Sequence, residues 1–173
     1  MNVVTDTGTP ARAVDGAPED VKARLVRGAV AGALSGAAFI AVTMWFATTV
    51  GDPAKGPLMM ISTIAKGDAA MAAGTADPTV GVLVHLVLSV VFGMLFGLIA
   101  PMLRTNAAVA LAGTAYGALL YLVNFKLIAP LLFPIFGMAN QPFELVVHIV
   151  FGVLVSFFFF STGVRRSEPL LSR

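Results

Sequence analysis

A nearly uninterrupted apolar stretch, ELVVHIVFGVLVSFFFFS, runs from Glu144 to Ser161. It begins with one acid and one histidine. Residues at four-residue steps share one face of a helix, so the residues Glu144, His148, Gly152 and Ser156 are predicted to lie in a line. A second stretch, HLVLSVVFGMLFG, has the same spacing. Its line consists of His85, Ser89, Gly93 and Gly97. The chain therefore carries two predicted helices on which a histidine heads a stripe of small residues.

The composition of the 173-residue chain is that of a membrane protein. Hydrophobic residues make up 58% of the chain and charged residues only 12%, whereas about a quarter of a soluble domain is charged. Four long stretches are nearly free of charge, and each supplies the roughly 20 residues that cross a bilayer. Backbone polar groups in lipid must pair within their own segment, so each stretch is predicted to be a helix. The predicted helices cover residues 27–50, 79–103, 106–129 and 142–164.

We therefore predict an all-α integral membrane protein, a four-helix bundle built from two tandem helical hairpins. The transmembrane domain is expected to cover residues 25–166. Residues 1–24 are rich in small and polar residues and predict a disordered cytoplasmic tail. A helix that continues into the membrane can nevertheless begin within residues 19–27. Residues 167–173 are predicted to form a short cytoplasmic C-terminal tail.

Two segments connect these helices on the predicted outer side. The longer one, residues 52–78, contains an apolar stretch from Leu58 to Ala65 that is too short to cross a bilayer. It predicts an interfacial helix or a re-entrant turn, which serves either as a surface loop or in binding. The second connection, residues 129–142, has three prolines and no charge, which predicts a stiff segment packed on the bundle or the membrane.

Basic residues beside the membrane ends predict the orientation of the chain. One side would carry Arg12, Lys22, Arg24, Arg27, Arg104, Arg165, Arg166 and Arg173. The other side would carry only Lys55, Lys66 and Lys126. Because the cytoplasmic side is the richer in Lys and Arg, both termini are predicted to be cytoplasmic. The net charge of +2 does not suggest a nucleic-acid partner, so the expected partners are the lipid bilayer and other membrane subunits.

Glycines at four-residue spacing predict close helix packing. The first predicted helix carries Gly28, Gly32 and Gly36, and the third carries Gly113 and Gly117. Small residues let helix backbones approach in a bilayer, where dispersion replaces the missing hydrophobic drive. These faces can pack within the chain or against a second copy. We expect a homo-oligomer, with a dimer through a glycine face as the specific form, or a subunit of a larger complex.

The two halves of the chain also show a weak internal repeat. The aligned pairs are His85 with His148, Gly32 with Gly113, Gly36 with Gly117 and Thr43 with Asn124. Each half has two helices, so the halves have the same orientation and a pseudo-twofold axis along the membrane normal. Both histidines are then expected near the outer surface at similar depth.

Ionisable residues inside membrane segments are costly, and they usually face the bundle interior and point to function. The small-residue stripes independently predict that His85 and His148 face inward, and Glu144 lies one helical turn from His148. A polar pocket open toward the outer side is therefore predicted. Its members are His85, His148, Glu144, Asn124, Thr43, Ser89 and Tyr121.

Several functions fit such a pocket. It can be a hydrogen-bonded cluster in a non-enzymatic scaffold, assembly factor or complex subunit. A histidine beside a glutamate titrates near neutral pH, which fits a pH-responsive or proton-linked transport protein. Two histidines at equal depth also fit b-type haem, held by His85 and His148, and Glu144 would complete a metal site with them. Phosphate loops, GxSxG, HExxH and cysteine are all missing, so we expect no enzyme and no cofactor, with haem as the alternative.

Residues 80–161 also resemble a known family. The set comprises His85, Ser89, Phe92, Gly113, Gly117, Asn124, Pro130, Pro134, Pro142, Glu144 and His148. In this set and its order, the chain resembles the YagU-like family of small bacterial inner-membrane proteins. The resemblance implies a multi-pass protein of a bacterial inner membrane with poorly defined function and a link to acid tolerance. It implies no catalytic residues.

Overall fold

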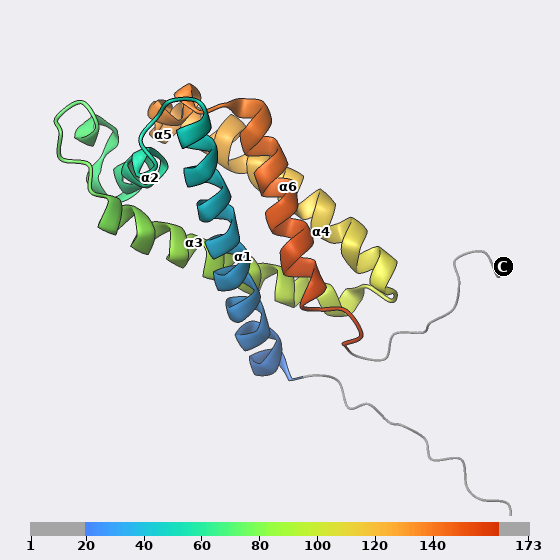
Figure 1. The fold of residues 1–173 in the computed structure, drawn as a ribbon. Helices are drawn as coiled ribbons and strands as arrows, with labels where there is room; N and C mark the ends of the chain where they lie inside the picture. The colour runs from blue at the N-terminus through green and yellow to red at the C-terminus, as the bar shows by residue number, and fades with distance from the viewer. Residues whose placement is uncertain (1–19, 163–173) are drawn as a thin grey trace, which may run out of the picture.

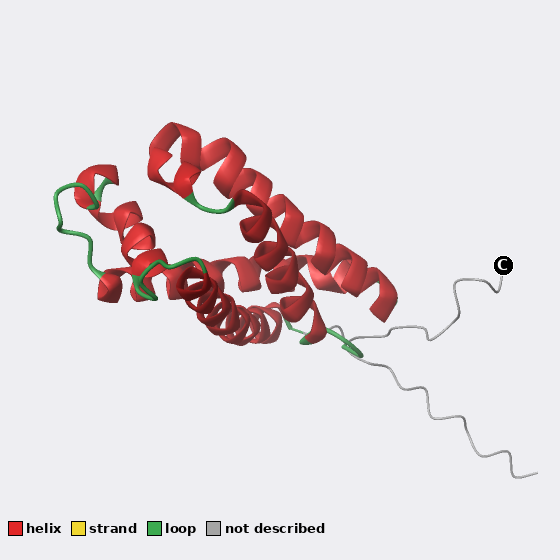
Figure 2. Cartoon of the chain, turned by 45° about the horizontal axis from the view of Figure 1, so that its top comes forward, coloured by secondary structure: helices red, strands yellow, loops and turns green. Residues whose placement is uncertain are grey.

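The computed structural model describes residues 20–162, and this part of the chain is entirely helix and turn, as the composition predicts. Figure 1 shows α1 and α6 side by side, with α3 crossing α1 obliquely. Figure 2 shows helix in nearly all of the described chain. The long helices are α1 (Val21–Thr49), α3 (Pro78–Ile99), α4 (Asn106–Tyr121) and α6 (Gln141–Phe157). The shorter elements are α2 (Gly56–Lys66), η1 (Asp68–Ala70), η2 (Ala100–Met102), η3 (Leu122–Ile128), α5 (Ala129–Leu132) and η4 (Pro134–Met138).

Three helical segments are long and apolar enough to cross a membrane. They are Val21–Thr49, Pro78–Met102 and Asn106–Leu132. The fourth predicted helix was expected to reach residue 164, and this is wrong, because α6 ends at Phe157 after 17 residues. The chain then turns, so that the ring of Phe159 is buried 5.6 Å from the ring of Phe96. Packing of this aromatic side chain against α3 replaces the expected continuation of the helix.

The other helix ends also differ from the prediction. Helix α1 already begins at Val21, where the side chain of Asp20 accepts a hydrogen bond from the Lys22 N–H. Residues 21–24 are thus helical and not part of a tail, while residues 1–19 and 167–173 of the predicted tails lie outside the described residues. The third predicted helix continues past residue 129 to Leu132.

Helix α4 continues through a proline because its hydrogen-bonding pattern changes. The π-helical segment η3 links α4 to α5, and Pro130 lies immediately beyond it in the first turn of α5. A proline inside a helix removes a hydrogen bond, and local π turns are one way in which membrane helices adapt to this loss. The helical run therefore reaches 27 residues.

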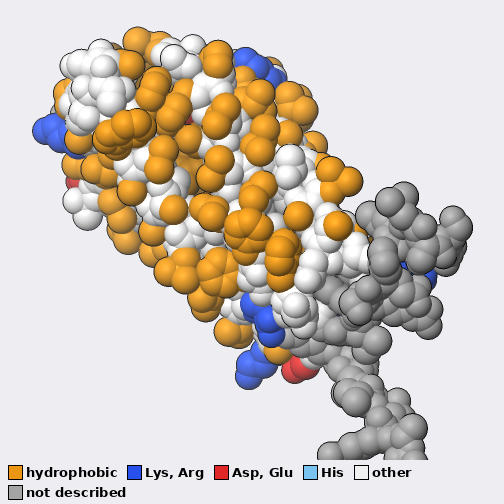
Figure 3. Space-filling view, turned by 45° about the vertical axis from the view of Figure 1, so that its right-hand side comes forward, with side chains coloured by type: hydrophobic (Ala, Val, Ile, Leu, Met, Phe, Trp, Pro, Cys, Tyr) orange, Lys and Arg blue, Asp and Glu red, His pale blue; other side chains and the backbone are white. Residues whose placement is uncertain are grey.

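Large apolar side chains cover the outside of the molecule. Trp45 is 64% exposed, Leu83 58% and Leu111 71%, although all three lie on long helices. Figure 3 shows apolar side chains over the middle of the visible face, with charged side chains toward the ends. An apolar surface of this extent marks contact with a membrane or a partner, and the long apolar helices favour a membrane protein.

Close contacts at glycines join the four long helices into two helix pairs, α1 with α3 and α4 with α6. Gly93 of α3 lies against α1, where a Cβ atom on it would come 2.6 Å from the Cα of Gly32. Gly152 of α6 lies against α4, where a Cβ would come 2.9 Å from the Cα of Gly117. The predicted packing residues all lie against other parts of the same chain. These are Gly28, Gly32, Gly36, Gly93, Gly97, Gly113, Gly117, Gly152 and Ser156. These glycine faces are therefore occupied within the chain, and the expected homo-oligomer or larger complex stays a prediction.

Aromatic contacts hold the two helix pairs together. The ring of Phe46 on α1 stacks on Phe143 of α6 with centroids 3.8 Å apart. The hydroxyl of Tyr116 on α4 donates a 2.8 Å hydrogen bond to the carbonyl of Phe92 on α3. Phe92 and Tyr116 pack against the buried core, which consists of Ala31, Phe96, Ala100, Val109, Leu120, Phe151, Val155 and Phe159.

The short helix α2 folds back against the beginning of α3. Gly81 makes this possible, because a Cβ at this position would overlap the backbone of Leu58. The N–H of Asp77 donates a 3.1 Å hydrogen bond to the hydroxyl of the fully buried Ser62. Helix α2 therefore packs against the bundle and does not lie apart as an isolated surface helix.

Candidate functional site

A cavity of about 240 Å³ lies between the two helix pairs. Its walls come from the second half of α1, from α2, from the middle of α3, from α6, and from the segment that runs from the end of α4 to just beyond η4. This is the end of the molecule opposite the start of α1 and the end of α6 (Figure 1). Six of the seven predicted pocket residues line this cavity, namely His85, His148, Glu144, Asn124, Thr43 and Ser89.

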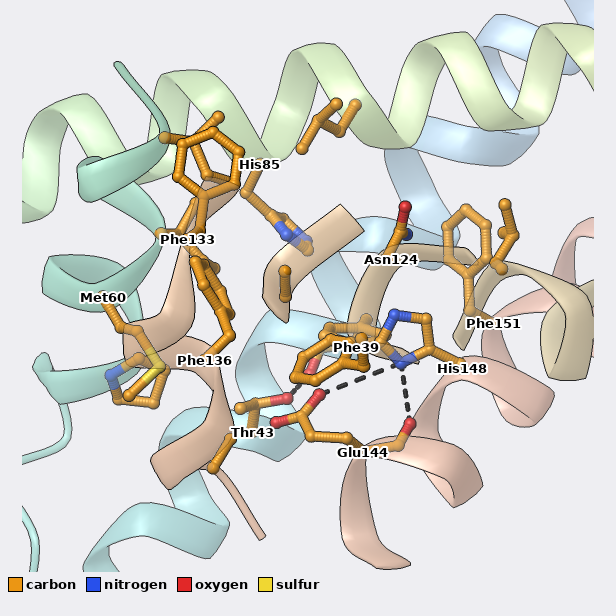
Figure 4. A pocket seen from close by; sticks show the side chains of 18 of the residues that line it. Phe39, Thr43, Met60, His85, Asn124, Phe133, Phe136, Glu144, His148 and Phe151 are labelled. Atoms are coloured by element: carbon orange, nitrogen blue, oxygen red, sulfur yellow. Dashed lines mark hydrogen bonds and ion pairs between the residues drawn. The ribbon is translucent and has the colours of Figure 1, made fainter. Parts of the chain in front are cut away.

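Glu144 and His148 form the polar side of the cavity. Asn140 caps α6 by accepting a hydrogen bond from the Phe143 N–H, which places Glu144 in the first turn and His148 one turn later. The Nδ1 of His148 lies 2.7 Å from the Glu144 carbonyl oxygen and 3.8 Å from its carboxylate Oε2 (Figure 4). A carbonyl oxygen can only accept, so Nδ1 carries a proton, and Nε2 of a neutral ring is then a hydrogen-bond acceptor. Both residues are buried, at 8% exposure each.

His85 is held from the opposite wall. Its Nε2 lies 2.9 Å from the carbonyl oxygen of Gly36 on α1 and 3.4 Å from the hydroxyl of Ser89. The carbonyl again requires a proton on this nitrogen, so Nδ1 is the acceptor in the neutral ring. The missing side chain of Gly36 is what allows this contact, because a Cβ there would come 3.5 Å from Nε2 and would overlap Ser89.

Phe39 contacts both histidines. Its ring centroid lies 5.4 Å from that of His85 and 5.0 Å from that of His148, to which it is perpendicular. A haem between the histidines would need its macrocycle where Phe39 lies. It would also need the His85 ring to rotate, or to release Gly36, so that a nitrogen could face the iron. The arrangement of these residues therefore does not favour bis-histidine ligation.

Most of the cavity wall is apolar, and much of it cannot be recognised from the sequence. Phe125 lies 5.3 Å from the ring of His148, and Phe136 packs on Phe125 at 5.7 Å. Helix α2 contributes Pro57, Met60, Ile61 and Ile64. Phenylalanine and aliphatic residues are abundant throughout the chain, so only the fold distinguishes those that face the cavity.

Tyr121 is the predicted pocket residue that does not line the cavity. Its ring contacts His148 at a centroid distance of 6.0 Å, and its hydroxyl donates to Oε1 of Gln141 at 3.1 Å. The same oxygen accepts a 2.9 Å hydrogen bond from Lys126, whose ammonium lies 5.4 Å from the Tyr121 ring centroid. Gln141 was not predicted, and it joins the end of the α4 helical run to the start of α6.

The acidic and imidazole groups of residues 20–162 do not assemble into a group of three that could hold a metal ion. The cavity thus offers hydrogen-bond acceptors and one carboxyl group within an apolar wall. Comparisons with protein-family models, with curated proteins and with solved structures found no match.

Proposed function

We propose that the chain is a non-enzymatic, multi-pass protein of a bacterial inner membrane that binds a small amphipathic molecule in the cavity. The observation that carries this proposal is the cavity itself, in which His85, Glu144 and His148 lie among a few other polar residues and a mostly apolar wall. Ligand sites are typically concave and apolar with a few convergent polar groups. The proposal goes beyond a purely structural role for the cluster, because a structural cluster does not require empty space beside it.

The membrane part of the proposal rests on the apolar surface and on the lengths of the helices. Three segments have spanning length, and the 17 residues of α6 lie at the short end of the roughly 17–25 that can span a bilayer. Local thinning of the bilayer accommodates a short helix at modest cost. Four spans, with both termini in the cytoplasm and the cavity on the outer side, agree with the distribution of Lys and Arg.

The size of the cavity limits its ligand. A dry cavity of about 150 Å³ admits benzene, and drug-sized ligands occupy about 300–1,000 Å³. The cavity of about 240 Å³ therefore suits a molecule with one ring or a short chain.

A pH-responsive role is the second candidate, and one contact favours it. The carboxylate of Glu144 and the imidazole of His148 lie 3.8 Å apart and both border the cavity, so their charges depend on each other. The resemblance to the YagU-like family, with its link to acid tolerance, points the same way. In this proposal pH acts on the same cavity and changes what it binds.

Binding of 4-phenylbutanol tests the proposed function. Equilibrium dialysis would be performed with the protein in phosphatidylcholine nanodiscs and with empty nanodiscs as the baseline. We expect saturable binding that is lost in Leu88→Trp, which fills the cavity from α3. Leu86→Trp is the matched control, because Leu86 lies on the same helix, does not line the cavity and is 45% exposed. Equal uptake by the wild type and Leu88→Trp would contradict the proposal and leave a structural role for the cluster.

A further inference from the structure

The one charged side chain of the cavity wall favours one type of ligand head group. Glu144 is the only Asp, Glu, Lys or Arg among the residues that line it. The nearest cation along α6 and η3, Lys126, is instead bonded to Gln141, which is not part of the lining. A buried carboxylate without a cation is costly, so a ligand that brings a positive charge would offset that cost.

The hydrogen-bonding groups support the same conclusion. The contacts of His148 and His85 to backbone carbonyls leave each neutral ring with an acceptor nitrogen. The hydroxyl of Thr43 donates to the carbonyl of Phe39 at 2.9 Å, which leaves its lone pairs as acceptors. Figure 4 shows Thr43, Glu144 and His148 close together around the ring of Phe39. The cavity therefore offers several hydrogen-bond acceptors, which a ligand with hydrogen-bond donors would satisfy.

The apolar wall is also suited to a cation. Six phenylalanines line the cavity, and the face of an aromatic ring attracts a cation within about 6 Å of its centroid. They are Phe39, Phe92, Phe125, Phe133, Phe136 and Phe151. The same rings would pack against the apolar body of a ligand.

We propose that the cavity selects amphipathic amines, molecules in which a protonated amino group is attached to a small apolar body. A primary ammonium group has three N–H donors and one positive charge, which match the acceptors and the carboxyl group around Phe39. The inference rests on the proposed function, since it names the ligand class of the same cavity. Protonation of Glu144 would remove the negative charge that attracts the amine, and protonation of His148 or His85 would add a competing cation to the wall, so the amine is expected to bind better at high pH than at low pH.

Three compounds with the same apolar body test this inference. They are 4-phenylbutylamine, 4-phenylbutanol and 4-phenylbutyrate, which carry an ammonium, a hydroxyl and a carboxylate. Dissociation constants would be measured at pH 8 in phosphatidylcholine nanodiscs, whose neutral surface does not concentrate the amine. We expect the amine to bind about tenfold more tightly than the alcohol, as a charge-assisted hydrogen bond replaces a neutral one. The carboxylate is expected to bind least tightly.

Two variants assign the preference to Glu144. Glu144→Gln keeps the shape of the side chain and removes its charge, so the ratio of amine to alcohol affinity should fall by about tenfold. Asp52→Asn removes the same charge from an exposed residue beyond the end of α1 and should keep the wild-type ratio. A wild-type protein that binds the alcohol or the carboxylate as tightly as the amine would overturn the inference and leave the proposed function standing. If Glu144→Gln kept the wild-type ratio of amine to alcohol affinity, the inference would also be overturned and the proposed function would stand. Absence of saturable binding of all three compounds would overturn both.

Discussion

Gly32 of α1 and Gly93 of α3 meet backbone to backbone, and a Cβ on Gly93 would come 2.6 Å from both the N and the Cα of Gly32. Gly32 also lies against Ser89 of α3, and in the other helix pair Gly113 of α4 lies against Gly152 of α6. The same alignment that pairs His85 with His148 also pairs Gly32 with Gly113, and Ser89 with Gly152. In both pairs the residue four positions after the histidine contacts the aligned glycine, while the tandem repeat itself stays a prediction.

Replacement of Gly93 by alanine should destabilise the protein. The added methyl group would meet backbone atoms of α1, which cannot rotate away as a side chain can, so the two helices must separate. Overpacking of this kind costs about 1–3 kcal/mol. Unfolding in mixed micelles would measure the loss, and Gly56→Ala is the control because a Cβ there has no neighbour within 4 Å. Equal stability of the two variants would show that α1 and α3 do not approach as described.

Gly152→Ala tests the close approach of α4 and α6. Its Cβ would lie 2.7 Å from the N and 2.9 Å from the Cα of Gly117. We expect a loss similar to that of Gly93→Ala, again about 1–3 kcal/mol, in the same unfolding assay. If Gly152→Ala were as stable as the wild type, α4 and α6 would not approach as closely as described.

The sequence predicts the helices better than it predicts the cavity. Polar residues such as His85, His148 and Glu144 are rare among apolar ones, so helical spacing suffices to place them on inward faces. Phe39 and the residues of α2 carry no such signal, because apolar side chains serve equally for lipid contact, core packing and cavity lining. The early end of α6 is also invisible in composition, since Phe157 and Phe159 are the same residue type and only the second is buried.

Tyr116→Phe should weaken the contact between α3 and α4. The substitution removes only the hydroxyl that donates to the carbonyl of Phe92 and preserves the ring packing against Phe96, whose centroid is 5.4 Å away. A hydrogen bond of this type contributes about 0.5–1.5 kcal/mol to stability, and we expect a loss in that range. The free energy of unfolding would be compared with that of Tyr121→Phe. That variant should lose less, because Lys126 still donates to Gln141 when the Tyr121 hydroxyl is removed.

Asp77 should make the start of α3 sensitive to acid. Its side chain accepts a 2.8 Å hydrogen bond from the Thr79 N–H, and this bond lowers the pKa of the carboxyl group below its usual 3.8. A lowered pKa in the folded state stabilises the protein above the usual value, and this stabilisation is lost as the pH falls through the lowered pKa. Asp77→Ala should therefore reduce the melting temperature at pH 7, and the difference from the wild type should shrink below pH 4.

Asp77→Asn separates the cap from the charge. Asparagine also caps helices well, so this variant should melt close to the wild type at pH 7 and show a smaller acid-induced decrease. A decrease of the same size in Asp77→Asn and the wild type would assign the acid sensitivity to another group.

The orientation of the chain can be tested directly because the sequence contains no cysteine. A single cysteine at Ala73, in the exposed connection before α3, should react with a membrane-impermeant maleimide in intact cells. A cysteine at Met102, which is 79% exposed between α3 and α4, should react only after the membrane is permeabilised. This difference follows from Arg104 and the basic residues near both termini, which favour the cytoplasmic side. Labelling of both positions from outside would contradict a membrane crossing by α3, and the reversed pattern would place the cavity on the cytoplasmic side.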